Sequence, residues 1–289
     1  MLCVSPMSVP RPGGRGPTDR TIVPCGKCPG CMSAKREGWT FRIMQEYKNC
    51  TQALFLTLTY DPEHVPMTES GCQTLRKNHI QLFMKRIRAT ASRNPELTFP
   101  APLKYYAIGE YGSKKMRPHY HVMAFNIPNF TDRRKLIKFL EDHWTYGHVD
   151  IGNVEPASVQ YVTSYVINKY VHDEYDEREK PFSLISKGFG MSYLTPEKVR
   201  YHQNNGEFLV RNNDNSKIKL PRYYAEKVFT SFDRELNKLK LQPGLDHKHE
   251  ENTAKAAELS SNNPYFYRMQ LETQARAAFY KKVKKGGTL

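Results

Sequence analysis

The sequence feature that most constrains the fold is a strand-like segment, residues 116–125, which carries the two histidines His119 and His121. Side chains two positions apart on an extended strand point to the same face, so the two imidazoles would lie side by side. Residues 104–110 also read as a strand, and a short glycine-containing loop joins the two segments into a predicted hairpin. Pairing across this hairpin would bring the carboxylate of Glu110 near both imidazoles.

Two neutral imidazoles and one carboxylate form a suitable ligand set for a divalent cation. Three protein ligands leave coordination positions open, where Mg²⁺ or Mn²⁺ could hold a phosphate oxygen. Most pairs of this kind on strands are incidental, so the hypothesis depends on the rest of the chain. We expect Glu110, His119 and His121 to bind the metal, whereas His143 and His148 share no spacing with them and are expected to be surface or core residues.

A helix predicted to begin near Pro156 supplies candidate nucleophiles. Tyr161, Tyr165 and Lys169 follow one another at i, i+4 and i+8, which aligns them along one side of the helix. A row of valines falls on a different face, which argues against the tyrosines serving only as core residues. A phenol has an unperturbed pKa of about 10, so a nucleophilic tyrosine needs a metal-polarised phosphate, and Lys169 could stabilise developing charge. Paired tyrosines with a metal site indicate phosphodiester chemistry.

These segments resemble, in their order and spacing, the three motifs of HUH rolling-circle endonucleases. The first is a hydrophobic strand that ends in Thr-Leu-Thr-Tyr-Asp at residue 61, and we assign it to the core beneath the site. The second runs from Gly-Glu-Tyr-Gly to Arg-Pro-His-Tyr-His over residues 109–121, and the third is Tyr-Val-x-x-Tyr-Val over residues 161–166. The chain is most similar to the replication initiation proteins of microviruses, small single-stranded DNA phages of the gokushovirus type. The similarity extends over roughly the first two thirds of the chain and includes residues 25–31, Trp39 and residues 81–86.

The resemblance implies a phage initiator that nicks one strand of origin DNA. In that family two tyrosines four residues apart act alternately, and an acidic residue upstream of the histidines is a third metal ligand, the position that Glu110 matches. The implied product is a 5'-phosphotyrosine intermediate with a free 3'-hydroxyl. Transesterification can then rejoin the strands without a nucleotide cofactor. Tyr161 and Tyr165 are therefore the expected nucleophiles, with Lys169 as a further catalytic residue.

The charge of the chain points to nucleic acid as a partner. A formal net charge of +15 and a sequence pI near 9.5 create a positive field that concentrates polyanions. Lys35, Arg36 and Arg42, on a helix predicted over residues 32–47, and Arg117, beside the histidines, are candidate DNA contacts. Charge alone also allows a basic protein without such a partner, or one that binds an anionic membrane surface, and a basic helix face is more often merely solvated.

Cysteine spacing predicts a second metal site. Cys25, Cys28 and Cys31 are separated by two residues each, and Cys3 is the candidate fourth ligand that a structural zinc ion needs. The alternative is a set of free thiols around a Pro-Gly turn. Six cysteines in 289 residues argue against a secreted disulfide framework and for a reducing compartment.

No apolar run reaches the roughly 18–20 residues of a membrane helix, and proline and glycine stand where a signal peptide would be apolar. We therefore expect action in the host bacterial cytoplasm, without a membrane. The sequence has no phosphate-binding Gly-Lys-Ser/Thr loop. The expected partners are single-stranded or nicked duplex DNA of the viral origin, together with a host helicase and DNA polymerase.

The expected architecture is α+β, with a central antiparallel sheet of HUH endonuclease type, packed helices, a cysteine-rich amino-terminal element and a mainly helical carboxy-terminal extension. The amino-terminal 24 residues read as an irregular arm, and carboxy-terminal helices are expected over residues 222–240 and 264–282. The expected segments are an arm and helix, an endonuclease core, and an extension with a basic tail, over residues 1–50, 51–175 and 176–289.

Two alternative functions remain open. A plasmid-type replication initiator or an HUH transposase would share the site, and genomic neighbours such as a capsid gene would distinguish it. A non-catalytic, zinc-stabilised DNA-binding or packaging protein would account for the charge and the cysteines. It gives no reason for Glu110, His119 and His121 to coincide with a paired-tyrosine helix, and metal-dependent DNA cleavage would exclude it.

Overall fold

The computed structural model divides the chain into two compact units. Met1–Gly38 and Leu194–Leu289 form the first unit, and Trp39–Tyr193 form the second. The residues that the structure describes are 3–14, 16, 18–94, 97, 99–128, 130, 132–164, 175–212, 215–259, 267, 269–270, 273–274 and 277.

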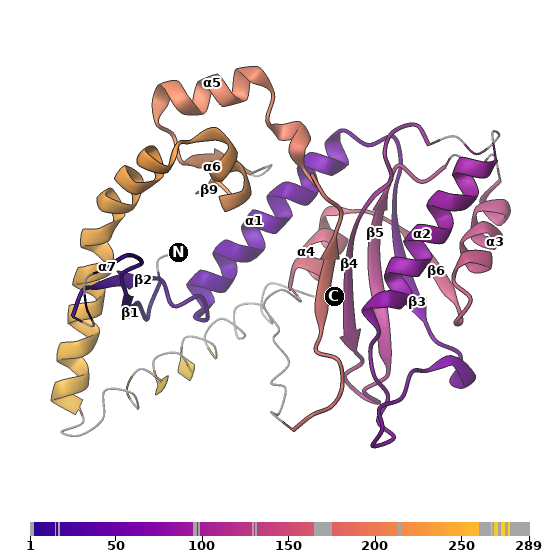
Figure 1. Cartoon of the computed structure of the whole chain (residues 1–289), viewed down its shortest axis with the longest axis horizontal. Coiled ribbons are helices and arrows are strands. Elements are labelled where there is room, and N and C mark those ends of the chain that lie inside the picture. The colour runs from indigo at the N-terminus through magenta and orange to yellow at the C-terminus, as the bar shows by residue number, and fades with distance from the viewer. Residues whose placement is uncertain are drawn as a thin grey trace. The chain divides into compact units, whose positions relative to one another are not determined.

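The second unit is built on a five-stranded antiparallel sheet with the strand order β6-β3-β5-β4-β7 (Figure 1). Its strands are rich in β-branched and aromatic residues, which favour extended structure. The predicted α+β fold with a central antiparallel sheet and packed helices is confirmed. The strands are β3 Ala53–Thr59, β4 Lys104–Tyr111, β5 Pro118–Phe125, β6 Val149–Asn153 and β7 Phe182–Ile185.

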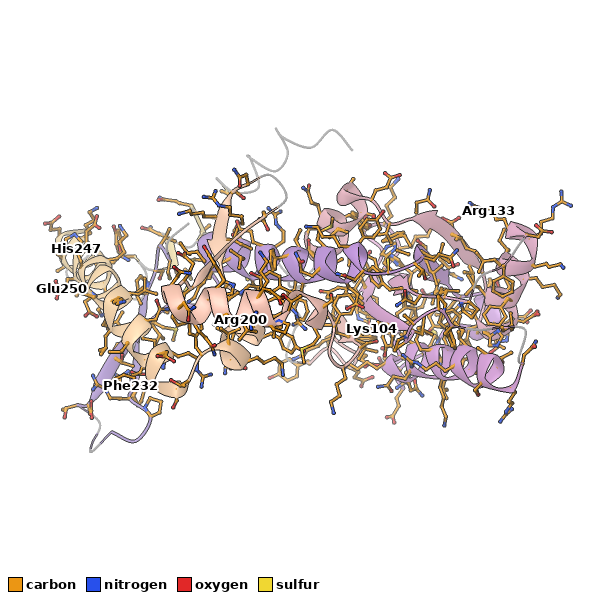
Figure 2. All side chains as sticks on the ribbon, turned by 90° about the horizontal axis from the view of Figure 1, so that it is seen from above. Lys104, Arg133, Arg200, Phe232, His247 and Glu250 are labelled. Atoms are coloured by element: carbon orange, nitrogen blue, oxygen red, sulfur yellow. The ribbon has the colours of Figure 1, made fainter. Side chains whose placement is uncertain are left out.

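One face of this sheet is covered by α2 (Lys77–Arg93) and α3 (Arg133–His143). The buried residues of α2 recur at helical spacing, as the sequence predicted, and pack with Tyr120, Val122 and Ala124 of β5. Asp132 caps α3 by accepting a hydrogen bond from the backbone nitrogen of Arg134 at 2.8 Å. The exposed Arg133 donates from Nη2 to the Ile151 carbonyl at 3.0 Å (Figure 2).

The opposite face of the sheet has its own hydrophobic core. Met123 and Phe125 of β5 belong to a cluster with Ile43, Val159 and Val162. Ile43 comes from the second half of α1 (Pro29–Lys48), and the two valines come from α4 (Pro156–Ser164). Because alternate residues of β5 point to alternate faces, His119 and His121 share this face with Met123 and Phe125.

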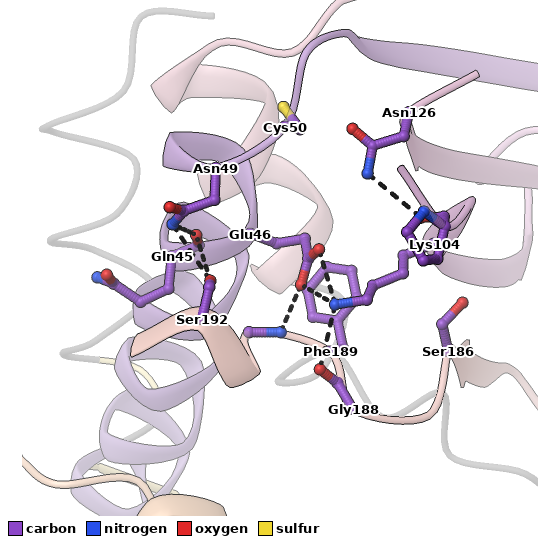
Figure 3. A network of polar contacts seen from close by, with 12 residues as sticks. Gln45, Glu46, Asn49, Cys50, Lys104, Asn126, Ser186, Gly188, Phe189 and Ser192 are labelled. Atoms are coloured by element: carbon purple, nitrogen blue, oxygen red, sulfur yellow. Dashed lines mark hydrogen bonds and ion pairs between the residues drawn. The ribbon is translucent and has the colours of Figure 1, made fainter. Parts of the chain in front are cut away.

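A buried ion pair joins α1 to the edge of this core. Lys104 Nζ lies 3.0 Å from Glu46 Oε1, and the lysine also donates to the Gly188 carbonyl at 3.3 Å (Figure 3). Glu46 is only 5% exposed, and its Oε2 accepts a hydrogen bond from the Gly190 backbone nitrogen at 2.7 Å. One carboxylate thus holds α1, β4 and the loop after β7 together. Short 3₁₀ helices, Pro62–His64 and Met191–Tyr193, complete the unit.

In the first unit, the prediction of an irregular arm was wrong. β1 (Met7–Pro10) and β2 (Arg20–Val23) form an antiparallel hairpin. Arg20 donates across the hairpin from Nε to Ser8 Oγ at 2.8 Å and from Nη2 to the Ser8 carbonyl at 2.9 Å. These contacts outweigh the weak strand preference of a segment rich in proline and glycine.

The carboxy-terminal extension also differs from the prediction. Thr230 and Asp233 exchange capping hydrogen bonds at 3.0 and 3.2 Å, so a new helix begins there and the single helix expected over residues 222–240 is two helices. The helix expected over residues 264–282 lies mostly outside the described residues. None of the described helices has the length and hydrophobicity that crossing a membrane requires. The elements are α5 Pro196–Asn205, β8 Leu209–Arg211, β9 Lys217–Lys219, α6 Arg222–Val228 and α7 Ser231–Leu259.

Helix α7 binds the amino-terminal arm. Gln242 Nε2 donates to the Ile22 carbonyl at 3.2 Å, and Asn252 Nδ2 donates to the Val4 carbonyl at 2.9 Å. Leu245, between them on the helix, packs against the cysteine cluster. The arm and the extension, which were expected to be separate segments, therefore share one compact unit.

We expect Lys104→Met to destabilise the second unit by about 3–5 kcal/mol, because the Glu46 carboxylate would stay buried without its counter-ion. The chain's two tryptophans, Trp39 and Trp144, both belong to this unit, so tryptophan fluorescence during urea unfolding reports on it selectively. The matched control is Lys138→Met. Lys138 pairs with Asp142 at the surface, where the side chains are 77% and 57% exposed, so its loss should cost less than about 1 kcal/mol. Equal losses in the two variants would contradict a stabilising role for the buried pair.

Candidate active site

Glu110, His119 and His121 converge on one face of the sheet, where β4 and β5 pair. Glu110 lies directly opposite His119 in the strand register. Its Oε1 is 2.8 Å from His119 Nε2 and 3.2 Å from His121 Nε2. The hairpin therefore brings together the three residues that the sequence placed in one group.

The Glu110 carboxylate is buried, with 7% of the residue exposed, and its Oε2 has no hydrogen-bond partner among the described residues. Burial raises the pKa of Glu110, but hydrogen bonds from His119 and His121 outweigh it and hold the pKa below its ordinary value. Burial lowers the pKa of His119, whereas the Glu110 carboxylate raises it above its ordinary value. A buried carboxylate oxygen without a partner is costly. The two imidazole nitrogens and this oxygen fit a divalent cation.

The outer nitrogen of each imidazole has a hydrogen-bond acceptor. His119 Nδ1 lies 3.2 Å from the Arg117 carbonyl, and His121 Nδ1 lies 3.2 Å from Thr57 Oγ1. If Nδ1 carries the proton and donates, the Nε2 lone pair of each histidine is free for a metal. Phe55 stacks on the His121 ring with centroids 5.4 Å apart and further restricts its orientation.

Tyr161 lies beside the ligand group. Its ring centroid is 5.4 Å from that of His121, at an interplanar angle of 82°. Helix α4 sets this position, because Val159 and Val162 are fully buried against the sheet and Tyr161 is left half-buried at the side of the cluster. Tyr165 and Lys169 lie outside the described residues.

The four candidate DNA contacts have different surroundings. Arg42 lies over the Trp39 ring, 4.5 Å from its centroid, and donates to the Phe189 carbonyl at 2.8 Å. Arg117 Nη2 donates to the Tyr60 carbonyl at 2.6 Å. Both arginines thus have protein partners within the second unit, whereas Lys35 is exposed and Arg36 is half-buried on the part of α1 in the first unit. Their contact with DNA remains a prediction.

Thr57 and Phe55 are site residues that the sequence analysis did not identify. Both belong to β3, whose residues were assigned mainly to the core. The available signal was strand pairing: Thr57 lies opposite His121 in the β3–β5 register, and paired residues point to the same face. Hydrophobicity could not reveal that β3 and β5 are neighbours.

A second group of metal-ligand side chains lies in the first unit. Cys3 Sγ is 3.6 Å from Cys25 Sγ and 3.8 Å from Cys28 Sγ, and all four sulfurs, including that of Cys31, lie within 4.8 Å of one another. A tetrahedral zinc site with Zn–S bonds of about 2.3 Å has S–S edges of about 3.8 Å. The separation thus fits four thiolates around one metal ion.

Backbone amides point at these sulfurs. Cys25 N donates to Cys3 Sγ at 3.3 Å, and Cys28 N donates to Cys25 Sγ at 3.2 Å. Hydrogen bonds from Cys25, Cys3 and Cys31 lower the pKa of Cys28 far below its ordinary value. Donors aimed at sulfur favour the thiolate, which is the form that binds metal.

Comparison with known proteins identifies related sequences. Residues 53–170 match the family of replication-associated proteins of the ORF2 type. Replication-associated protein ORF2 of Spiroplasma virus 4 is 30% identical over 220 residues, which cover 71% of this chain and 67% of the relative. Replication-associated protein VP4 of Bdellovibrio phage phiMH2K is 30% identical over 214 residues, which cover 70% of this chain and 66% of the relative.

Among solved structures, the chain matches the amino-terminal nuclease domain of non-structural protein 1 from minute virus of mice. The identity is 13% and the TM-score is 0.20, over 54% of this chain and 79% of that domain. A likeness this weak supports no structural argument.

We expect Thr57→Val to weaken Mn²⁺ binding about 10- to 100-fold, because the isosteric valine removes the acceptor that orients His121. Mn²⁺ titration followed by electron paramagnetic resonance measures this without relying on activity. Thr57→Ser, which keeps the hydroxyl, should bind like the wild type. Thr59→Val is the matched control on the same face of β3, because the Thr59 hydroxyl bonds to neither histidine in the described chain. Equal effects of the two valine variants would show that Thr57 does not position His121.

Proposed function

The chain belongs to the family of ORF2-type replication-associated proteins, and from that premise we propose that it is a phage rolling-circle replication initiator. Its reaction is site-specific nicking of one strand of viral origin DNA. The observation that carries the proposal is the convergence of Glu110, His119 and His121 beside Tyr161. A protein that only binds DNA would gain nothing from a phenol next to a buried cluster of metal-ligand side chains.

Glu110, His119 and His121 are the proposed ligands of a catalytic Mg²⁺ or Mn²⁺ ion. The cation would polarise the scissile phosphate and neutralise charge on its oxygens. The outer hydrogen bonds from His119 and His121 fix the rings, so that both Nε2 atoms face the Glu110 carboxylate. The two rings are therefore oriented before any substrate arrives.

Tyr161 is the proposed first contact with the scissile phosphate. Its phenolic oxygen attacks phosphorus and loses its proton, the bond to the 3'-oxygen breaks, and that oxygen leaves as a hydroxyl. The product is a 5'-phosphotyrosine diester, and because one diester replaces another, the reverse attack by a 3'-hydroxyl can rejoin the strand without a nucleotide cofactor.

Tyr165 and Lys169 complete the proposed machinery. A second tyrosine can attack the regenerated origin while the first is still attached to DNA, which suits repeated turnover. Lys169 would stabilise charge that develops during attack. A host helicase and polymerase in the bacterial cytoplasm would separate and extend the strands. Basic residues such as Lys35 and Arg36 would add phosphate contacts.

The cysteine cluster is the proposed site of a structural zinc ion, held by Cys3, Cys25, Cys28 and Cys31. Four sulfur ligands leave no open coordination position, which is typical of structural sites. The ion would tie the start of the chain to the beginning of α1, and α7 packs on the same cluster through Leu245. Support for this proposal comes from the sulfur separations and the backbone amides that point at sulfur.

We expect the wild-type chain with Mn²⁺ to form a covalent adduct with single-stranded oligonucleotides that span the phage origin, seen on a denaturing gel. Tyr161→Phe combined with Tyr165→Phe should abolish the adduct, because no phenol remains to attack, while DNA affinity changes less than about twofold. His119→Ala combined with His121→Ala should reduce adduct formation at least about 100-fold through loss of the metal.

The control for the tyrosine variants is Tyr201→Phe, at an exposed tyrosine of α5 in the first unit. It should form the adduct at the wild-type rate. An adduct that persists in the double tyrosine variant would refute the nucleophile assignment. DNA binding without any adduct, under either metal, would favour the non-catalytic DNA-binding protein instead.

We expect about one zinc ion per purified wild-type chain, and none after Cys25→Ser combined with Cys28→Ser, by inductively coupled plasma mass spectrometry. Cys50→Ser combined with Cys72→Ser is the matched control and should retain the metal, because neither residue belongs to the cluster. Unchanged zinc content in the first double variant would rule out the cysteine site.

A further inference from the structure

The ribbon formed by β8 and β9 has an apolar inner face and a basic outer face. Val210 and Ile218 are paired in the strand register, and both are buried, each 6% exposed. The flanking positions of both strands are exposed. Three of these four positions carry a cation; the residues are Leu209, Arg211, Lys217 and Lys219.

Two of the cations lie directly opposite each other. Arg211 pairs with Lys217 in the register, and like charges at opposed positions of an antiparallel pair destabilise it. Arg211 Nη1 contacts only neutral groups of the turn, the carbonyl and side-chain oxygens of Asn215, at 3.3 and 3.2 Å. This arrangement is costly for a free ribbon and favourable for one that binds an anion.

Neighbouring cations of the same unit have carboxylate partners. Within the described residues, none of the three ribbon cations forms such an ion pair. The neighbouring pairs are Arg200–Glu197 at 3.5 Å, Arg222–Glu226 at 2.6 Å and Lys238–Glu235 at 2.8 Å. The positive charge of the ribbon is therefore locally uncompensated.

The ribbon is held on a folded support. Leu220 N donates to the Phe208 carbonyl at 2.8 Å, and Phe208 stacks on Phe229 with ring centroids 3.9 Å apart. His202, which is 1% exposed, contacts the Glu207 carbonyl through Nδ1 at 2.7 Å. Helices α5 and α6 thus fix both ends of the ribbon, and its cations are presented by an ordered surface.

We propose that the β8–β9 ribbon binds duplex DNA, with Arg211, Lys217 and Lys219 contacting backbone phosphates along the major groove. A two-stranded ribbon, with strands about 4.8 Å apart, fits a groove about 12 Å wide. Phosphates along the groove walls supply the anions that this surface lacks, and counterion release drives the association.

The outer face of the ribbon favours duplex DNA over other anionic partners. Single strands are bound mainly by aromatic side chains on which bases stack, and the four outward residues include none. An anionic membrane surface would require large apolar anchors, and only Leu209 is apolar. The inference rests on the proposed function in one respect: an initiator that nicks one strand must first hold the duplex that contains it.

The test is Arg211→Gln combined with Lys217→Gln and Lys219→Gln, in the full chain. Affinity for a labelled duplex of about 30 base pairs and for its single strand is measured by anisotropy over a series of salt concentrations. For the duplex, the slope of log affinity against log salt should fall in magnitude by about 2.7, which is about 0.9 for each phosphate that the variant no longer neutralises. Duplex affinity at 0.15 M salt should fall at least about tenfold. Affinity for the single strand should change much less.

A matched control removes the same charge elsewhere in the first unit: Arg200→Gln on α5 (Figure 2) combined with Lys238→Gln and Lys240→Gln on α7. It should leave the duplex slope unchanged within about one unit. The charge-conserving combination Arg211→Lys, Lys217→Arg and Lys219→Arg should retain duplex binding. If the triple variant does not fold, Lys217→Gln alone should still lower the slope by about 0.9.

Thermal stability separates binding from a structural role. Removing opposed like charges should leave the melting temperature of the triple variant equal to or above that of the wild type. Equal slope changes in the ribbon and control variants, or equal losses for single and double strands, would overturn the proposal. A lowered melting temperature that accounts for the loss would do so as well. Failure of the wild type to form a DNA adduct would refute the endonuclease but leave duplex binding by the ribbon to be judged separately.

Discussion

The register of the β4–β5 hairpin is the constraint on which the candidate active site depends. It sets Glu110 opposite His119 and places His121 two residues further along the same face. A slip of one residue would turn the two imidazoles to the other face and separate them from the carboxylate. Gly109 helps to hold the register, because a Cβ at this position would lie 2.9 Å from the Phe182 ring and 3.1 Å from the Tyr120 ring. The glycine next to the acidic ligand is thus required by packing across β4.

The two faces of the sheet have separate roles as a consequence of this register. On one face, α2 and α3 bury Tyr120, Val122 and Ala124 in an apolar core that fixes the strands. On the other face, the same strand carries the histidines, and the core formed with α4 ends where Tyr161 meets His121. The site therefore lies at the margin of a hydrophobic cluster, where imidazole rings are held firmly and a substrate can still approach.

The first unit is organised by contacts between the two ends of the chain. The cysteine cluster brings Cys3 to the beginning of α1, and α7 adds hydrogen bonds to the arm on both sides of Leu245. The β8–β9 ribbon belongs to the same unit. A basic surface there and a nucleophilic site in the second unit would divide the holding of duplex DNA from the cutting of one strand.

The sequence by itself determined the local elements and much of the candidate site. Alternation around His119 and His121, the helical spacing in α2 and the valine face of α4 are short-range patterns, because strand and helix periods act over a few residues. Cysteine spacing likewise identified three of the four clustered thiols and nominated the fourth. Glu110 could be added because a hairpin pairs residues that are close in the chain.

Only the tertiary structure decided which distant residues meet. Thr57 reaches His121 because β3 lies beside β5, and no local pattern specifies that neighbour. Arg42 appeared to be a free DNA contact, but the fold brings it to Trp39 and the Phe189 carbonyl. The hairpin of the arm, the break between α6 and α7 and the shared unit of the two chain ends arise from contacts of this kind. Their energies depend on packing across long sequence separations, which local propensities do not encode.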